Sequence, residues 1–487
     1  MSLADPNQAL ALFEAASDHV AAGDYASAEA LYREALVHNP LFPQAHANLG
    51  YLLDHRGALQ EAERAMRTAI SMAPALCGVR LNLGALLLQQ KRLAEAEAVY
   101  ADALALEPDV AALWSNLGSL YIAMQREDDA QTCLNKALQL DPDAKNAAFN
   151  LAYLRLRHGH FREGWQLFEA RDWYATMAAH FQFPRWQGES LRERALLLSF
   201  EAGHGDVIQF CRYATLLKAR GAARVSLVCH PALVRLMQSL PALDQVISFT
   251  DAVPATGYDY WLPLLSAPLY CHTGPTVGDV GDVGEISVYG ETPYLYADPL
   301  LTNTWAGALP PAGPLRVGLV WQGNPAFEND RDRSLPTMDL LKPLWTVADA
   351  EKLVFISLQK GRGEAEAQQF STQPQTPLTC LGHRMEDFAD AAAIVSQLDL
   401  VISVDTAMAH LAGAVGTPCW TLLPDYMTDW RWGAQGTHSA WYPGAFVLFR
   451  QDKAQRWEPV IDRLTQALAA AVERHTQARQ AGAPWNT

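Results

Sequence analysis

The segment NLGYLLDHRGALQEAERAMRTAISMAP (residues 48–74) is followed 34 residues later by NLGALLLQQKRLAEAEAVYADALALEP (residues 82–108). The tripeptide Asn-Leu-Gly returns at 116–118, and a fourth copy at 150–152 reads Asn-Leu-Ala. Proline keeps the same step, at Pro40, Pro74, Pro108 and Pro142. Two independent markers in phase at an interval of this size indicate a repeat architecture, and this decides the fold of the first third of the chain.

Each repeated unit predicts a pair of helices. Small residues after the leucine allow close helix contact, and apolar residues between 93 and 106 recur at helical spacing. Proline closes each unit because it cannot continue a helix. The pattern resembles the tetratricopeptide repeat, so we expect an all-α solenoid over residues 1–176. Its full units are predicted near residues 7–40, 41–74, 75–108 and 109–142, with a degenerate unit to about 176.

Solenoids of this kind bury their helices against neighbouring repeats and present a concave surface that commonly holds a peptide or protein. The repeated asparagines either line this surface and bind an acceptor protein, or join neighbouring helices by hydrogen bonds. Both interpretations stay open, as does an array that only forms a homo-oligomer or packs on the rest of the chain. The four asparagines are Asn48, Asn82, Asn116 and Asn150.

Bulk composition excludes several classes of function. A chain of 487 residues with 50% hydrophobic residues can bury about three folding units. The net charge of -16 would repel a nucleic acid. Seven scattered cysteines without a C-x-x-C pair indicate neither a metal site nor a redox site. Because the chain start lacks a signal peptide and no run of eighteen apolar residues occurs, we expect a cytoplasmic protein without a membrane span.

After the junction at Phe183–Gly188, short apolar strands alternate with helices, which is typical of parallel-sheet domains. A Pro/Gly-rich linker at Leu309–Pro314 separates two such series, so we expect domains at 177–310 and 311–487. Two doubly wound domains in tandem would place a ligand between the carboxyl ends of their sheets. The first series predicts strands at 195–200 and 225–229, a turn at 201–206 and a helix at 207–220. The second predicts strands at 315–321, 352–359, 400–404 and 418–423, helices near 337–349 and 386–397, and a helical tail at 456–479.

One strand of the second series runs directly into Asp405 and Thr406 and then into a helix of small residues that contains His410. Backbone N–H groups in the first turn of such a helix favour a bound diphosphate. Helix capping alone would also explain Asp405 or Thr406. His410 is either a core histidine or a group that reaches a phosphate or sugar.

This segment resembles the glycosyltransferase family 9 enzymes, the bacterial heptosyltransferases, and more distantly the protein O-GlcNAc transferases that also carry tetratricopeptide repeats. The family's donor site has a strand ending in Val-Asp-Thr before a helix with a histidine, matched by Val404, Asp405, Thr406 and His410. The family commonly has glycine after the threonine, where Ala407 stands here. The resemblance covers about residues 190–450 and implies a GT-B fold of two Rossmann-like domains.

The turn Gly203-His204-Gly205-Asp206 is similar to the turn that opens the first sheet of the same family. The resemblance implies that Asp206 is the general base that deprotonates an acceptor hydroxyl. Asp206 and His204 are therefore the candidate catalytic residues. The competing role for Asp206 is to cap the helix that follows.

The candidate donor-binding residues follow the first two strands of the second series. Arginine side chains there would offset the charge of a leaving phosphate without a metal, whereas the alternative is a solvated charged loop. Asp330-Arg331-Asp332 imitates a metal-binding Asp-x-Asp motif, but its arginines argue against a cation. Asp429–Trp432 lies where GT-B enzymes bind the donor sugar, although its aromatic residues could serve packing only. The donor-binding candidates are Gln322, Asn324, Arg331, Arg333, Ser334, Gln359, Lys360, Asp405, Thr406 and His410.

We therefore predict an inverting, metal-independent glycosyltransferase that moves a sugar from a nucleotide-sugar donor to a protein held by the repeats. The donor is a co-substrate, and no cofactor is expected. By analogy of architecture the acceptor protein is a flagellin. A glycine-rich stretch at 274–290 is expected to be an acceptor-side loop. Two alternatives stay open: a heptosyltransferase-like enzyme of lipopolysaccharide or glycan synthesis, and a non-catalytic scaffold.

Overall fold

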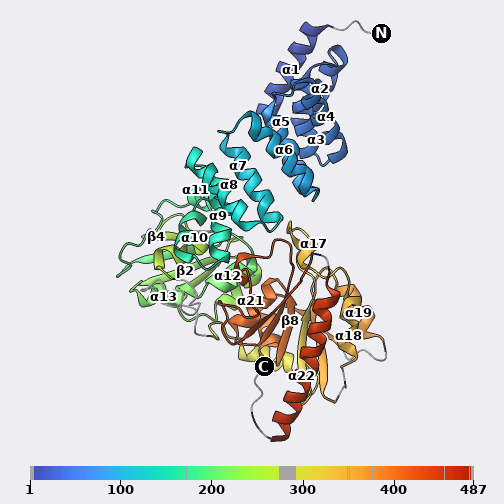
Figure 1. Cartoon of the computed structure of the whole chain (residues 1–487). Coiled ribbons are helices and arrows are strands. Elements are labelled where there is room, and N and C mark those ends of the chain that lie inside the picture. The colour runs from blue at the N-terminus through green and yellow to red at the C-terminus, as the bar shows by residue number, and fades with distance from the viewer. Residues whose placement is uncertain are drawn as a thin grey trace. The chain divides into compact units, whose positions relative to one another are not determined.

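The computed structural model describes residues 5–171, 173–273, 292–347, 349, 351–373, 378–454, 456–481 and 483. The chain divides into two compact units, a first unit at Met1–Leu151 and a second unit at Ala152–Thr487 (Figure 1). The glycine-rich stretch at 274–290 lies outside the described residues. The domain limits expected at residues 176 and 310 stay predictions.

Paired helices make up the described part of the first unit (Figure 1). Their first helices begin at Pro43, Cys77 and Ala111, a step of 34 residues, and the next helix begins at Lys145. The pairs are α1 (Pro6–Ala21) and α2 (Tyr25–His38), α3 (Pro43–His55) and α4 (Leu59–Met72), α5 (Cys77–Gln89) and α6 (Leu93–Leu106), and α7 (Ala111–Ala123) and α8 (Glu127–Leu140). The predicted repeat array is confirmed.

The repeated glycines explain how closely the helices of a pair approach. A Cβ atom added to Gly50 would lie 2.8 Å from Met66 Cγ, and one on Gly84 would lie 2.4 Å from the ring of Tyr100. At Gly118 the same atom would lie 2.7 Å from the Leu134 side chain. Each partner stands 16 residues further along the chain on the second helix. A larger residue at these positions would therefore push the two helices of a pair apart.

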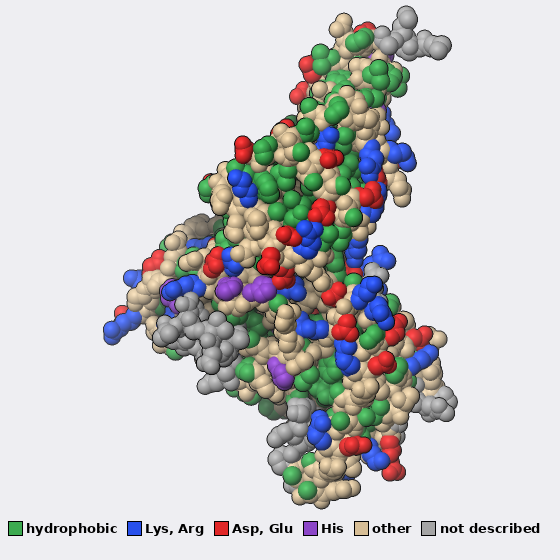
Figure 2. All heavy atoms as spheres, in the orientation of Figure 1, with side chains coloured by type: hydrophobic (Ala, Val, Ile, Leu, Met, Phe, Trp, Pro, Cys, Tyr) green, Lys and Arg blue, Asp and Glu red, His purple; other side chains and the backbone are tan. Residues whose placement is uncertain are grey.

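Charged side chains of the array lie mostly on its surface and form pairs across repeats. Arg33 contacts Glu61 at 3.0 Å and Arg67 contacts Glu95 at 3.2 Å, again with the 34-residue step. On the face drawn in Figure 2, the described Lys and Arg side chains are interspersed with Asp and Glu side chains. Exposed pairs of this kind contribute about 0–1 kcal/mol each, so the apolar helix contacts carry most of the stability.

The second unit begins within α9 (Lys145–Arg157), continues through α10 (Phe161–Phe168) and α11 (Ala175–His180), and then forms two parallel sheets. Among the described residues, the first sheet has the strand order β3-β2-β1-β4. Its central strand β1 is almost fully buried, as expected of a parallel sheet covered on both faces. The elements are β1 (Ala195–Ser199), α12 (His204–Phe210), α13 (Tyr213–Ala219), β2 (Arg224–Cys229), η1 (Pro231–Leu233), α14 (Val234–Met237), β3 (Gln245–Ser248), β4 (Tyr260–Pro263), η2 (Leu264–Ser266) and α15 (Ala267–Cys271).

The second sheet has the strand order β10-β9-β8-β5-β6-β7 among the described residues, and its pairings are parallel. Its elements are α16 (Pro299–Ala306), β5 (Leu315–Val320), α17 (Asp330–Arg333), η3 (Met338–Leu341), α18 (Lys342–Trp345), β6 (Leu353–Ser357), α19 (Glu364–Ser371), β7 (Leu378–Cys380), η4 (Gly382–Arg384), α20 (Phe388–Val395), β8 (Leu400–Val404), α21 (Ala407–Ala414), β9 (Cys419–Leu423), η5 (Trp430–Trp432), β10 (Phe446–Arg450) and α22 (Glu458–Ala481). The predicted order, a helical array followed by parallel α/β sheets, is confirmed.

Several local predictions were wrong in detail. The turn expected at 201–206 is shorter, because α12 already begins at His204, and the single helix expected at 207–220 is two helices. The helix expected near 337–349 consists of η3 and the short α18, which ends at Trp345. The charged loop around Asp330 contains a helical turn, α17. In the described part of the chain, no helix has the length and apolar character needed to cross a bilayer.

Candidate functional site

The carboxyl ends of β1 and β8 each lead into a helix, and these two helices, α12 and α21, pack against each other. A Cβ atom on Gly205 would lie 2.9 Å from His410 Cδ2 and 3.4 Å from Ala407 Cα. The absence of a side chain at Gly205 therefore lets the first turns of both helices meet. The structure brings together the two segments that the sequence singled out, at the edge where parallel sheets bind ligands.

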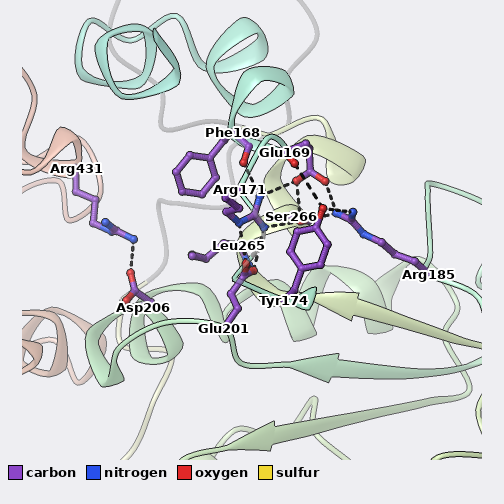
Figure 3. Close-up of polar contacts among 10 residues, drawn as sticks. All are labelled: Phe168, Glu169, Arg171, Tyr174, Arg185, Glu201, Asp206, Leu265, Ser266 and Arg431. Carbon is purple, nitrogen blue, oxygen red and sulfur yellow. Dashed lines mark hydrogen bonds and ion pairs between the residues drawn. The ribbon is translucent and has the colours of Figure 1, made fainter. Parts of the chain in front are cut away.

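Asp206 is the third residue of α12 and uses both of its carboxylate oxygens. Its Oδ2 accepts a hydrogen bond from the Gly203 backbone N–H at 2.8 Å, which closes the first turn of the helix. Its Oδ1 pairs with the guanidinium of Arg431, which follows β9 in the second sheet (Figure 3). The capping role and a position facing the other sheet's loops thus occur together in one side chain.

Arg431 is the centre of a polar cluster. Its Nε donates to Gln209 Oε1 at 2.7 Å, and its Nη1 donates to both oxygens of Asp429 at 3.1 Å. Only 9% of the residue is exposed. Burial lowers the pKa of Arg431, but Asp429 and Asp206 outweigh this effect and hold the pKa above its usual value. Arg431 therefore carries a fixed positive charge beside two carboxylates.

The sequence analysis noted the segment that contains Arg431 but did not select this residue. The available signal was an arginine between two tryptophans shortly after the carboxyl end of a strand. Its guanidinium lies 4.3 Å from the centre of the Trp430 ring. The flanking aromatic rings, Trp430 and Trp432, are almost fully buried.

Thr406 and His410 belong to α21. Thr406 occupies the N-cap position, but its hydroxyl lies 3.1 Å from Ser403 Oγ and makes no capping bond to the helix backbone. His410 is buried, with its Nδ1 2.9 Å from the Tyr442 hydroxyl and its ring stacked on Trp432. Burial, together with the charges of Arg431 and Arg212, holds the pKa of His410 well below its usual value. His410 is therefore neutral and packed.

Asp405 is a half-buried carboxyl group at the start of the same helix. Burial and the charge of Asp429 raise the pKa of Asp405 to about 6, while Arg333 and Arg431 oppose the shift. The basic loop after β5 is thus close enough to act on Asp405 electrostatically. A carboxyl group with this pKa changes its protonation state just below neutral pH.

The loop after β5 is built around Asp330, which is itself buried. Its Oδ1 accepts from the Ser334 hydroxyl at 2.9 Å and from Arg333 Nε at 3.4 Å, and its Oδ2 accepts from Arg362 at 3.0 Å. Ser334 Oγ also accepts from the Gly323 N–H at 2.8 Å. These bonds fix the loop that carries Arg333 and the exposed Arg331. Within the described ranges, no group of three His, Cys, Asp or Glu side chains is arranged to hold a metal.

Gln322 and Gln359 hold the ends of β5 and β6 together. Gln359 Oε1 accepts from the backbone N–H groups of Trp321 and Gln322, both at 3.1 Å, and its Nε2 donates to the carbonyls of Gln322 and Arg362. Gln322 Nε2 donates to the Leu335 carbonyl at 3.1 Å. Both amides are thus engaged within the protein.

Two other donor-binding candidates lie on the surface. The Lys360 ammonium donates to the Met385 carbonyl, and Lys360 itself is exposed. Asn324 is also exposed, and its Oδ1 accepts from the Ala326 N–H at 3.0 Å. Of these two, Lys360 alone brings a positive charge to the carboxyl end of β6.

His204, the first residue of α12, lies between two aromatic rings. The centre of its ring is 4.5 Å from that of His230 and 5.2 Å from that of Phe388. Burial and the neighbouring His230 lower the pKa of His204 to about 4. His204 is therefore neutral at physiological pH, and a neutral imidazole here could accept or donate a proton only at one nitrogen at a time.

A second polar cluster, which we name the Arg171 cluster, lies next to the segment that carries Asp206 (Figure 3). The guanidinium of Arg171 donates to both carboxylate oxygens of Glu201, at 2.7 and 3.0 Å, and to Ser266 Oγ at 2.6 Å. The Arg171 side chain is fully buried and that of Glu201 is 1% exposed. The complete cluster is Glu169, Arg171, Arg185, Glu201 and Ser266. Since Glu201 stands two residues after β1, the cluster fixes the backbone that leads to Asp206.

Comparison with known proteins adds a family to this geometry. Residues 347–425 match the model of glycosyltransferase family 9 (heptosyltransferase), and residues 115–170 match a tetratricopeptide repeat model. The chain carries tetratricopeptide repeats and a family 9 glycosyltransferase segment. Residues 12–141 also match the middle TPR-like domain of cilia and flagella-associated protein 70.

A curated relative covers more of the chain. Protein FlbA of Caulobacter vibrioides is 27% identical over 344 residues, which cover 66% of this chain and 54% of FlbA. The chain thus spans about half the length of that relative. Similar solved structures are MamA of Desulfovibrio magneticus RS-1 (20% identical, 33% of this chain and 92% of MamA, TM-score 0.31) and pilF of Pseudomonas aeruginosa (24% identical, 34% and 76%, TM-score 0.32).

The family 9 segment runs from the end of α18 to the residues after β9. It includes Gln359, Lys360, Asp405, Thr406 and His410. Asp206 and Arg431 lie outside the matched residues. The contact between Asp206 and Arg431 is therefore an observation of this structure and is independent of the family match.

The repeated asparagines of the first unit are half-buried. Asn48 Nδ2 donates to the Tyr32 hydroxyl at 2.9 Å, from α3 to α2, and Asn150 Nδ2 donates to Ser119 Oγ at 2.8 Å, from α9 to α7. These two amides thus join neighbouring helices. Contact of Asn48, Asn82, Asn116 and Asn150 with an acceptor protein stays a prediction.

Proposed function

We propose that the second unit transfers a sugar from a nucleotide-sugar donor to a hydroxyl group of a protein, with inversion and without a metal ion. The observation that carries this proposal is the contact between Asp206 and Arg431, at the point where the helices after β1 and β8 meet. The family 9 match supports glycosyl transfer as the reaction class. Two parallel sheets in sequence support the GT-B arrangement.

The donor would bind at the carboxyl end of the second sheet. The N–H groups in the first turn of α21 have no side-chain cap, so they can receive the diphosphate. Arg333 and the exposed Arg331 and Lys360 would supply positive charge around it. This proposal assigns the stabilisation of the leaving group to protein cations.

In the transfer step, the acceptor oxygen attacks the anomeric carbon while the bond from that carbon to the donor phosphate breaks. Asp206 takes the hydroxyl proton, and the nucleotide leaves with the bonding electron pair. The neighbouring guanidinium of Arg431 favours the ionised, proton-accepting form of such a carboxylate. Attack from the face opposite the leaving group inverts the anomeric configuration.

The repeats would recruit the acceptor protein, since solenoids of this type offer an extended surface for a polypeptide. By analogy of architecture we propose a flagellin as the acceptor. A second candidate is sugar transfer to a lipopolysaccharide or another glycan, which is favoured by the heptosyltransferase description of the matching family model. The two candidates differ in the acceptor and use the same donor site.

A thermal-shift screen against UDP-, GDP-, ADP-, CMP- and dTDP-linked sugars tests the donor site. A donor at 100 times its Kd stabilises the native state by about 2.7 kcal/mol, so one nucleotide class should raise the melting temperature. Transfer is then measured with the stabilising donor on flagellin and on lipopolysaccharide. Stabilisation by none of the donors would favour a non-catalytic scaffold.

The substitution Asp206→Asn tests the chemistry. It keeps the side-chain shape and one oxygen for the Gly203 N–H, so the fold should persist by circular dichroism while turnover falls by about 10²- to 10⁴-fold. Unchanged turnover in a folded Asp206→Asn variant would exclude Asp206 as the base.

A further inference from the structure

We infer that the helix pair α9–α10 is a working part of the candidate site, in which Tyr153 and Trp165 position the loop that carries Arg431. This loop, Asp429–Ala434, is named the Arg431 loop. The inference rests on the proposed function, because positioning matters only if Arg431 and Asp206 act together on a substrate. It concerns residues of the second unit alone.

Trp165 of α10 packs directly against the residue beside Arg431. It is 2% exposed, and its ring meets that of Trp430 edge to face with 5.3 Å between the centres. The same ring also meets Phe210, at the end of the helix that carries Asp206, at 6.0 Å. One side chain of α10 therefore contacts both elements that hold the Asp206–Arg431 pair.

The end of α9 is bonded to the other end of the Arg431 loop. The Ala434 backbone N–H donates to the Arg157 carbonyl at 3.2 Å. A Cβ atom on Gly433 would lie 3.8 Å from the same carbonyl oxygen, so the loop backbone runs close to the helix end. The two contacts, through Trp430 and Ala434, fix the loop on both sides of Arg431.

Tyr153, also on α9, lies within the electrostatic field of the candidate site. Burial raises the pKa of the Tyr153 phenol, Asp429 and Asp206 raise it further, and Arg431 opposes them. Its ring lies 6.3 Å from that of Phe168, which in turn meets Trp430 at 6.2 Å. α9 thus contributes a polar group as well as a wall of aromatic rings.

The arrangement has a chemical consequence. Arg431 is a charged group that must stay about one hydrogen-bond length from Asp206, and small displacements of such groups can lower a rate by about a hundredfold. The aromatic contacts of Trp165 with Trp430 and Phe210 link the two sides of the pair. Tyr153 and Trp165 are therefore positioning residues, and they act through Arg431.

Hydrogen exchange of the full-length protein tests the inference without any substrate. In Trp165→Ala, the amides of the Arg431 loop should exchange at least about tenfold faster than in the wild type, because the loop loses its support. Trp165→Phe keeps an aromatic ring and should restore slow exchange. The matched control is Trp114→Ala in α7, whose indole donates to the Pro108 carbonyl at 2.7 Å within the first unit. This control should leave the Arg431 loop unchanged.

Kinetics with the donor found by thermal shift provide the second readout. Trp165→Ala should lower kcat by about tenfold or more with little change in the KM for the donor, and Trp165→Phe should recover most of the loss. Tyr153→Phe, which is expected to fold, should lower kcat by a factor of about 3 to 10. Its matched control is Tyr121→Phe in α7, whose hydroxyl donates to Glu97 at 3.1 Å.

The two readouts separate this inference from the proposed function. Unchanged exchange in the Arg431 loop of both Trp165→Ala and Tyr153→Phe would overturn the positioning role, whatever the activity. Faster exchange in a protein that transfers no sugar in its wild-type form would support the positioning role and contradict the proposed function. If Trp165→Ala does not fold, Tyr153→Phe decides by the same exchange measurement.

Discussion

The guanidinium of Arg431 contacts the carboxylate of Asp206, although 225 positions separate the two residues and they follow strands of different sheets. The same guanidinium bonds to Asp429, so one cation serves two carboxylates. A carboxylate beside a fixed cation keeps its negative charge more easily than one without. Arg431 is therefore expected to set the pH range over which the candidate site works.

Replacing Arg431 by glutamine should move the acid limb of the pH–rate profile to higher pH. Without the cation, the carboxylates of Asp206 and Asp429 bind protons more readily, and a protonated base cannot accept the acceptor's proton. Arg431→Lys keeps the charge and should move the limb less. The measurement is kcat/KM between pH 5 and 9.

The control for this series is Arg235→Gln. Arg235 pairs with Asp387 at 3.1 Å in the same unit, but its side chain is 42% exposed. Its pH–rate profile should match that of the wild type. A profile of Arg431→Gln that also matches the wild type would show that Arg431 does not govern the base.

The Arg171 cluster should be sensitive to the loss of one partner. Arg171→Met leaves the carboxylate of Glu201 buried without its counterion, which should lower the free energy of unfolding by about 3–5 kcal/mol. The double variant Arg171→Met/Glu201→Gln removes the unpaired charge and should recover part of this loss. Urea unfolding of the two variants and the wild type measures both effects.

An exposed pair in the same unit serves as the comparison for the Arg171 cluster. Arg194 contacts Asp259 at 2.8 Å, and its side chain is 53% exposed. Arg194→Met should therefore cost only about 0–1 kcal/mol. A cost for Arg171→Met as small as that of Arg194→Met would contradict the assigned role of the cluster in holding the segment before Asp206.

The sequence predicted the elements whose pattern is local. The 34-residue step located the repeat helices because the glycines and prolines that repeat are themselves the contact and end points of each helix pair. The fully apolar strands, such as β8, were also predicted. The short strand β3 was not, because a run of four residues with polar ends carries little periodicity.

The candidate site divides in the same way. The turn before Asp206 and the helix start at Thr406 are local motifs, and the sequence identified both. The partner of Asp206 is Arg431, and the support of Arg431 comes from Trp165, so these contacts depend on how distant segments pack. His410 was open between core and ligand site, and its bond to Tyr442 could be seen only in three dimensions.

Gly205 is expected to be the position least tolerant of a side chain at the meeting of α12 and α21. In Gly205→Ala, the added methyl group would lie 2.9 Å from His410 Cδ2, so the helices must separate or the histidine must shift. Overpacking of this kind costs about 1–3 kcal/mol, and the melting temperature should fall accordingly. Gly203→Ala is the control, since its nearest atom lies at 3.4 Å, an ordinary contact distance. Equal melting temperatures for the two variants would show that the helices are not tightly packed there.

The last prediction concerns Asp405 and the dependence of stability on pH. Its pKa of about 6 in the folded protein is above the model value of 3.8, so the folded state binds the proton more tightly than the unfolded state. The resulting stabilisation is fully present below pH 3.8 and is lost as the pH rises through about 6. Above that pH the charged carboxylate lowers the stability of the wild type.

Asp405→Asn removes this charge, so it should raise the free energy of unfolding at pH 8 by about 1–2 kcal/mol and change it little at pH 4. Urea unfolding at both pH values measures the difference, with Asp251→Asn at an exposed position as the control. A lower stability of Asp405→Asn at pH 8 would mean that attraction of the carboxylate to Arg333 and Arg431 exceeds the cost of its burial. In that case Asp405 would belong with the stabilising charges of the site, and the burial and Asp429 contributions that raise its pKa would be smaller than the two arginines' effect.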